Sequence, residues 1–168
     1  LEAGRISLEI VDLTDYDATL PHFAGIDRVV HLAANPDIRL GTRVTDTDLR
    51  HGTIATYNVL ESMRQHGVKD IAFASSSVVY GEGAPLPTPE DHGPCIPISL
   101  YGASKAAGEG LVGAYVGTFG FRAWIFRFAN IIGGRGTHGV IFDFIHKLVA
   151  TPERLEVLGD GRQEKSYM

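Results

Sequence analysis

The chain of 168 residues is short of several features, and each shortage excludes a class of protein. Cys95 is its one cysteine, so it forms no intramolecular disulfide and suits a reducing compartment, the cytoplasm. The formal net charge is −5, which argues against a general nucleic-acid binder. No apolar run approaches the roughly 20 residues that cross a bilayer, and the charged side chains among residues 1–15 argue against a signal peptide. We therefore expect a cytoplasmic protein with neither a nucleic acid nor a membrane as partner.

Near-continuous apolar runs, which are typical of strands buried on both faces of a parallel sheet, alternate with segments of helical spacing. The expected strands are residues 6–11, 26–34, 69–76, 121–130 and a short one at 155–158. The expected helices are residues 16–24, 48–65, 100–118 and 140–149. This alternation indicates βαβ units, and the chain is long enough for one domain with a sizeable core. The expected fold class is therefore α/β with a parallel sheet.

The stretch 71–105 carries the groups with the most chemistry. Its strand ends in a run of three serines, residues 75–77. Residues 81–98 hold five of the eight prolines and form a long loop of the kind that is usually functional. Tyr101 and Lys105 are four residues apart, so they share one face of a helix, and an ammonium ion beside a phenol lowers the phenol pKa. Because ligands bind at the carboxyl ends of strands in open α/β sheets, we expect this acid/base pair near the serines.

Other polar residues have plainer interpretations. His31 lies inside an apolar strand and has no partner at ligand spacing, so we expect a hydrogen-bonded core histidine, and no metal site is predicted. Arg127 is expected to have a structural role near the site.

Five motifs occur in one order along the chain. They are His31–Ala34, Ala74–Gly81, Tyr101–Lys105, Arg127–Asn130 and Leu158–Gly161. With these motifs the chain resembles the extended short-chain dehydrogenase/reductase family, and within it the NAD-dependent nucleotide-sugar epimerases and dehydratases. The resemblance implies a Rossmann-like doubly wound parallel sheet, NAD as cofactor with NADP as the open alternative, a nucleotide sugar such as a UDP-hexose as partner, and a homodimer. It also implies reversible inversion at the sugar C4, with UDP-glucose and UDP-galactose as the expected pair, by transient transfer of a hydride to NAD.

The family resemblance assigns roles to individual positions. Tyr101 corresponds to the catalytic acid/base, Lys105 to the residue that holds the nicotinamide ribose and lowers the tyrosine pKa, and Ser76 to the hydroxyl that bonds the reacting oxygen of the sugar. The implied cofactor contacts are Asp12, Leu13, Leu32, Ala33, Ala34, Ser75, Tyr101 and Lys105. The implied substrate contacts are Ser76, Asn130 and Lys165.

The resemblance is incomplete at both ends of the chain. Nothing matches the family's Gly-x-x-Gly-x-x-Gly turn, so we expect the sheet to lack its N-terminal glycine-rich βαβ start. We also expect residues 1–168 to be a partial NAD-binding domain that lacks the C-terminal substrate lobe, with only the start of the substrate-binding region near 131–168. Gly52 stands where relatives often have a cofactor-contacting asparagine, and Lys165 where many have an arginine. If these residues were the whole protein, we would expect weak or no NAD binding and no turnover.

Two alternatives stay open beside the epimerase. Dehydratases and decarboxylases of the family carry acidic residues where this chain has Ser77 and Val78, which leaves another extended short-chain reductase as the enzymatic alternative. A truncated, non-catalytic Rossmann-like module is the other alternative, and the missing glycine turn favours it.

Overall fold

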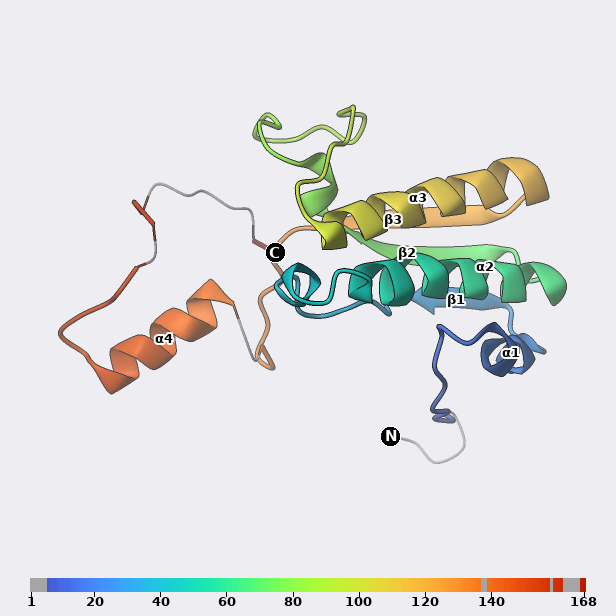
Figure 1. The fold of residues 1–168 in the computed structure, drawn as a ribbon, viewed down its shortest axis with the longest axis horizontal. Helices are drawn as coiled ribbons and strands as arrows, with labels where there is room; N and C mark the ends of the chain where they lie inside the picture. The colour runs from blue at the N-terminus through green and yellow to red at the C-terminus, as the bar shows by residue number, and fades with distance from the viewer. Residues whose placement is uncertain (1–5, 137–138, 158, 162–166) are drawn as a thin grey trace. The chain divides into compact units, whose positions relative to one another are not determined.

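The structure is a computed structural model that describes residues 6–136, 139–157, 159–161 and 167–168 (Figure 1). It has two compact units, residues 1–127 and 128–168. In chain order its elements are α1 (Tyr16–Thr19), the 3₁₀ turn η1 (Leu20–Phe23), β1 (Arg28–His31), the 3₁₀ turn η2 (Leu40–Thr42), the π-helix η3 (Leu49–Ile54), α2 (Ala55–Gln65), β2 (Asp70–Ser76), the 3₁₀ turn η4 (Ser77–Tyr80), α3 (Leu100–Phe119), β3 (Arg122–Phe128) and α4 (Val140–Ala150).

Three strands form one parallel sheet in the order β1-β2-β3. Between β1 and β2 the register runs from Arg28 opposite Asp70 to His31 opposite Phe73. The parallel sheet expected from the sequence is confirmed, as are three of its predicted strands, and the fold is Rossmann-like.

Both α2 and α3 pack on one face of this sheet, as Figure 1 shows. The core between the layers contains Leu60 from α2, Phe73 from β2 and Val112 from α3, each no more than 1% exposed. Burying a side chain of this size contributes about 1.5–3 kcal/mol. These contacts fix the helix that carries Tyr101 relative to the strand end that carries Ser76.

Local sequence determines where α3 begins, where it ends and how closely it packs. Ser99 caps its first turn by accepting a 3.0 Å hydrogen bond from the Gly102 amide. Gly120 ends the helix in the left-handed conformation, with φ of 67°. In the middle of the helix, a Cβ on Gly108 would lie 2.6 Å from Cζ of Phe73. Only glycine at this position lets α3 approach β2 so closely.

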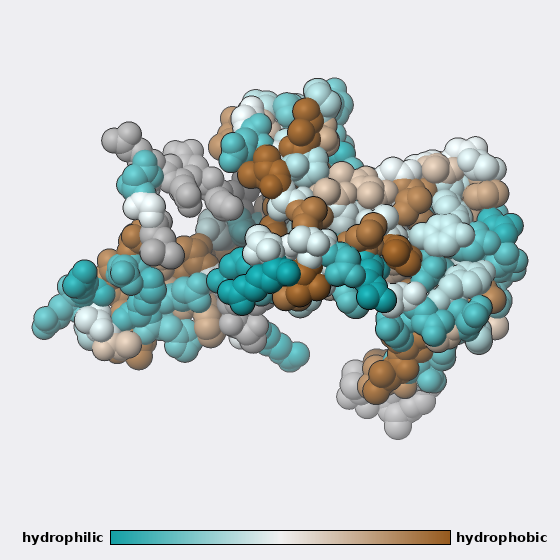
Figure 2. All heavy atoms as spheres, in the orientation of Figure 1, coloured by the Kyte–Doolittle hydropathy of each residue, from teal (hydrophilic) through white to brown (hydrophobic). Residues whose placement is uncertain are grey.

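The predicted strand at residues 6–11 is wrong. These residues have no regular structure, and Leu8 and Ile10 are 86% and 95% exposed. Hydrophobic side chains, in brown, are visible at the surface in Figure 2. A strand forms only where a neighbouring strand shares its backbone hydrogen bonds, and residues 6–11 pair with no strand in the described part of the chain.

The predicted helix 16–24 is divided, and the predicted helix 48–65 begins differently. α1 gives way to η1 at Leu20, because Pro21 has no backbone N–H to donate. Residues 49–54 form a π-helix before α2, and π-turns inside helices are frequent at functional sites. The predicted helices 100–118 and 140–149 are confirmed as α3 and α4.

The second unit consists of α4 and the segments on either side of it. Asn130 and Tyr167 form a parallel bridge, in which the Met168 amide donates to the Asn130 carbonyl at 3.0 Å. Residues 155–157 do not form the short strand expected there, because they pair with no described strand, and Leu158 lies outside the described residues. No helix in the described ranges is long and apolar enough to cross a membrane.

Candidate active site

Ser76, Tyr101 and Lys105 meet at the carboxyl end of β2. Ser76 is the last residue of that strand, and its side chain interacts with the Tyr101 phenol. The Lys105 amine donates a 2.6 Å hydrogen bond to the carbonyl of Ala74, which lies two residues before Ser76 on the same strand. It also lies 5.8 Å from the centre of the Tyr101 ring. The structure thus brings the three predicted catalytic side chains together.

Burial controls the protonation of this pair. It is the largest cause that raises the pKa of Tyr101; the Asp48 carboxylate raises it further, and the interaction with Ser76 opposes both. Burial also lowers the pKa of Lys105, which is 3% exposed. The net pKa of Tyr101 is raised, whereas the sequence pattern led us to expect that Lys105 lowers it.

A cavity of about 440 Å³ opens past the end of β1, and we term it the β1 cavity. Of the predicted cofactor contacts, Asp12, Leu13, Ala33 and Ala34 line it. Asp12 accepts hydrogen bonds from the Thr14 amide and hydroxyl, at 2.9 and 2.8 Å, and these bonds lower its pKa. The cavity therefore combines an aliphatic wall with an anionic group.

The lining of the β1 cavity fits part of a dinucleotide. Aliphatic walls accept a planar base, and polar groups at the rim fix its sugar. Besides Asp12, the side chains of Thr47 and His51 line the cavity and offer such polar groups. Together with Lys105, which the family resemblance assigns to the nicotinamide ribose, the side chains present fit NAD.

Two predicted cofactor contacts lie elsewhere. Leu32 is 66% exposed and does not line the β1 cavity. The Ser75 hydroxyl is buried and donates a hydrogen bond to Glu109 on α3. The Ser75 side chain is therefore engaged within the protein rather than open to a cofactor.

Glu109 is a residue of this region that the sequence pattern did not single out. It accepts from Arg127 on β3, Nε to Oε1 at 2.9 Å and Nη2 to Oε2 at 2.7 Å, in addition to Ser75. Arg127 also donates to the Glu90 carbonyl at 3.2 Å, which confirms its expected structural role. Burial raises the pKa of Glu109, but the hydrogen bonds from Arg127 and Ser75 outweigh it, and the pKa is lowered. The sequence could have pointed to Glu109, because it lies four residues after Lys105 and shares the same helical face.

The core role expected for His31 is confirmed. Its Nε2 bonds the Thr56 hydroxyl at 3.0 Å, and its ring stacks on Phe73 with the centroids 5.7 Å apart. Burial lowers the pKa of His31 to about 4, and the charge of Lys105 contributes. Among residues that the structure describes, no three His, Cys, Asp or Glu side chains are grouped as a metal site.

The predicted substrate contacts beyond Ser76 belong to the second unit. Asn130 lines a cavity of about 870 Å³, together with side chains of α4 and with Tyr167. Lys147, also on α4, adds a cation to this lining. Lys165, the other predicted contact, lies outside the described residues.

Comparison with known proteins places these motifs in a family. The model of the NAD dependent epimerase/dehydratase family matches residues 2–168. The chain belongs to this family.

Three similar proteins illustrate the range of its relatives. A solved UDP-galactose 4-epimerase is 46% identical, with a TM-score of 0.83, and the match covers 96% of this chain and 52% of that one. MoeE5, solved in complex with UDP-glucose and NAD, is 31% identical, with a TM-score of 0.76, over 91% of this chain and 52% of that one. The GDP-mannose 3,5-epimerase 1 of Oryza sativa subsp. japonica is 33% identical over 94% of this chain and 45% of its own. The chain spans about half the length of these relatives.

Gly52 is a position where this member of the epimerase/dehydratase family differs from the expected pattern. A Cβ on Gly52 would lie 2.5 Å from Oγ and 2.8 Å from Cβ of Ser104 on α3. The helix therefore occupies the space that an asparagine side chain would need. An asparagine at this position would therefore require Ser104 to move.

Proposed function

We propose that the protein containing this chain is a nucleotide-sugar 4-epimerase that interconverts UDP-glucose and UDP-galactose with bound NAD. The observation that carries the proposal is the meeting of Ser76, Tyr101 and Lys105 at the carboxyl end of β2. Membership of the family and the likeness to a UDP-galactose 4-epimerase support it.

Each of the three side chains has its own task in this proposal. Tyr101 takes the proton of the sugar C4 hydroxyl as a phenolate and returns it as a phenol. Ser76 holds the same oxygen by a hydrogen bond, and Lys105 holds a ribose and adds positive charge near the phenol. When bound, NAD supplies reversible acceptance of a hydride and a positive charge that favours the phenolate.

The residues after Ser76 favour an epimerase over a dehydratase. Ser77 and Val78 occupy the positions where dehydratases of the family carry acidic side chains, and here they form the start of η4. Neither side chain can remove a proton from the carbon next to C4. A reaction confined to C4 is therefore the one that these residues support.

The test uses the full-length protein that contains these residues, supplied with NAD. Tyr101→Phe should slow the conversion of UDP-galactose to UDP-glucose by roughly 10²–10⁴-fold, because it removes the hydroxyl that carries the proton. The urea midpoint should stay unchanged, since the ring still packs. Tyr57→Phe, at a tyrosine that is 46% exposed, is the matched control and should keep the wild-type rate.

The same assay, repeated with GDP-mannose and UDP-N-acetylglucosamine, tests the choice of sugar nucleotide. Conversion of either of these without conversion of UDP-galactose would reject UDP-glucose and UDP-galactose as the substrate pair. A Tyr101→Phe variant that retains the wild-type rate would reject the catalytic assignment.

A further inference from the structure

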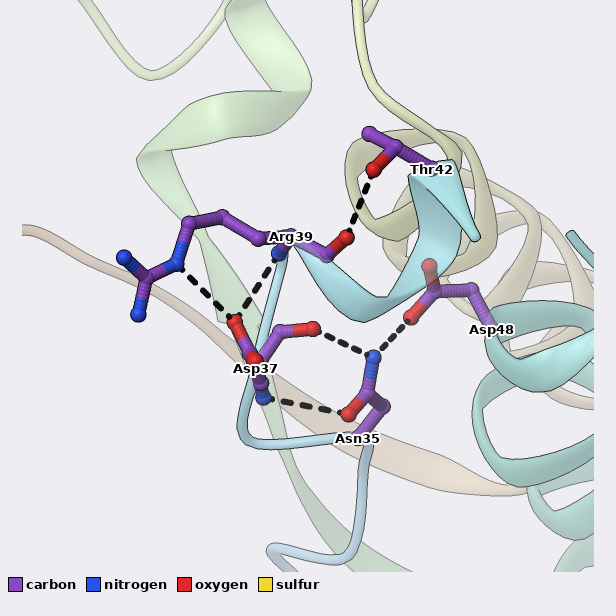
Figure 3. A network of polar contacts seen from close by, with 5 residues as sticks. All are labelled: Asn35, Asp37, Arg39, Thr42 and Asp48. Carbon is purple, nitrogen blue, oxygen red and sulfur yellow. Dashed lines mark hydrogen bonds and ion pairs between the residues drawn. The ribbon is translucent and has the colours of Figure 1, made fainter. Parts of the chain in front are cut away.

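Asp48 is a buried carboxylate to which the proposed reaction gives no task. It is 1% exposed and directly precedes the π-helix η3. Its Oδ1 accepts a 3.0 Å hydrogen bond from Asn35 Nδ2, as Figure 3 shows, whereas its Oδ2 has no hydrogen-bond partner within the described chain. A buried charge with a single hydrogen bond is unfavourable for folding, so its position needs an explanation.

The Asn35 side chain uses both ends of its amide to form the turn after β1. Its Nδ2 also donates to the Asp37 carbonyl at 2.8 Å, and its Oδ1 accepts from the Asp37 amide at 3.0 Å. Asn35 lines the β1 cavity next to Ala34 and Pro36. The Asn35 side chain thus joins one wall of that cavity to Asp48 by a hydrogen bond (Figure 3).

The second carboxylate oxygen of Asp48 lies close to Gly41, and Gly41 lies beside the start of α3. A Cβ added to Gly41 would lie 2.5 Å from this Oδ2 and 3.6 Å from Cβ of Leu100, the first residue of α3. The next residue is Tyr101, and the charge of Asp48 raises its pKa. Asp48 is therefore hydrogen-bonded to the wall of the β1 cavity, and it lies beside Gly41, which in turn lies beside the helical turn that carries the phenol.

We propose that Asp48 is a positioning residue that holds the Asn35 turn, and with it the wall of the β1 cavity, against the first turn of α3. The proposal rests on the proposed function in so far as the β1 cavity receives part of a dinucleotide. Three substitutions separate the contributions. Asp48→Ala and Asn35→Ala each remove the hydrogen bond between the two side chains, whereas Asp48→Asn removes the charge and keeps an oxygen that accepts from Asn35.

Limited digestion with trypsin tests the tie between Asn35 and Asp48 without a cofactor. Arg39 lies in the segment between them, and its side chain is 89% exposed. Asp48→Ala should speed cleavage after Arg39 about tenfold, the change expected for the loss of one hydrogen bond. Asn35→Ala should speed it at least as much, because it also removes the two hydrogen bonds with Asp37. Asp48→Asn should stay close to wild type. Asp46→Asn is the matched control, because Asp46 is exposed and pairs with Arg50 at 3.6 Å.

Isothermal titration of the full-length protein with NAD tests the consequence for the cavity. Asp48→Ala and Asn35→Ala should each weaken binding about tenfold. The double variant should bind no more weakly than Asn35→Ala alone, because that substitution already removes the one hydrogen bond of Asp48. Asp48→Asn should keep the wild-type affinity, because its amide oxygen still accepts the hydrogen bond from Asn35.

The two measurements give separable outcomes. Unchanged cleavage after Arg39 in both alanine variants would overturn the proposal, and so would faster cleavage with unchanged affinity for NAD. Faster cleavage in a protein whose wild type does not bind NAD would support the tie between Asn35 and Asp48 and reject the proposed function.

Discussion

The stability of the protein should fall as the pH is lowered from 7 to 5, because His31 is buried without a proton. Burial and, second, the charge of Lys105 lower the His31 pKa from 6.5 to about 4 in the folded chain. Between these values the unfolded chain binds a proton that the folded chain does not, so stability is full above pH 6.5 and is lost as the pH falls towards 4. This lowering corresponds to about 3 kcal/mol in total, of which about 2 kcal/mol is lost between pH 7 and pH 5.

Urea unfolding of the full-length protein, followed by circular dichroism at the two pH values, measures this loss. His31→Gln removes the imidazole and leaves an amide for the Thr56 hydroxyl, so its stability should change by less than about 0.5 kcal/mol over the same interval. His22→Gln, at an exposed histidine, should follow the wild type. Equal losses of free energy in the wild type and in His31→Gln would refute the reasoning.

Two further substitutions, also followed by urea midpoints, test the contacts of α3. Glu109→Gln should destabilise the fold by about 2–3 kcal/mol, because it leaves Arg127, 24% exposed, without its counter-charge. Arg50→Gln is the control, because it breaks the ion pair with Asp46, in which the arginine side chain is 61% exposed. It should destabilise the fold by less than about 1 kcal/mol. Equal losses of stability in the two variants would show that the Glu109–Arg127 pair is no stronger than this exposed pair. Gly108→Ala should destabilise by about 1–3 kcal/mol, whereas Gly113→Ala, where nothing lies within 4 Å of an added Cβ, should not. A neutral Gly108→Ala would contradict the close packing of α3 on β2.

The central strands could be predicted from the sequence because their apolar runs are buried. Ile71 and Phe73 are 0% and 1% exposed, and such a run has few alternatives to a place in a parallel sheet. The same apolar pattern gave a wrong prediction at residues 6–11. It shows that a segment can form a strand, but not whether a neighbouring strand is there to pair with it. The π-helix at residues 49–54 left no trace in the periodicity, since a widened turn changes the spacing only locally.

The candidate site could be predicted only where its members share an element. Tyr101 and Lys105 belong to one helix, where a spacing of four fixes a common face. Asn35 and Asp48 are 13 residues apart across a loop without a period, so no local pattern joins them. The direction of the Tyr101 pKa also needed the structure, because it depends on burial and on the charge of Asp48. Sequence spacing alone predicted the opposite direction, since it placed Lys105 near the phenol but showed neither the burial of the phenol nor the position of Asp48.

The helix that carries the phenol and the amine is weakly helical by its own composition. Five of its 20 residues are glycines, at positions 102, 108, 110, 113 and 117. Each glycine lowers the intrinsic stability of a helix by about 1 kcal/mol relative to alanine, so a peptide of residues 99–120 is expected to be mostly unstructured in water. α3 must therefore gain its order from β2, whose Phe73 it contacts through Gly108. In the course of folding, Tyr101 and Lys105 acquire their common face only after the strand beneath them is in place.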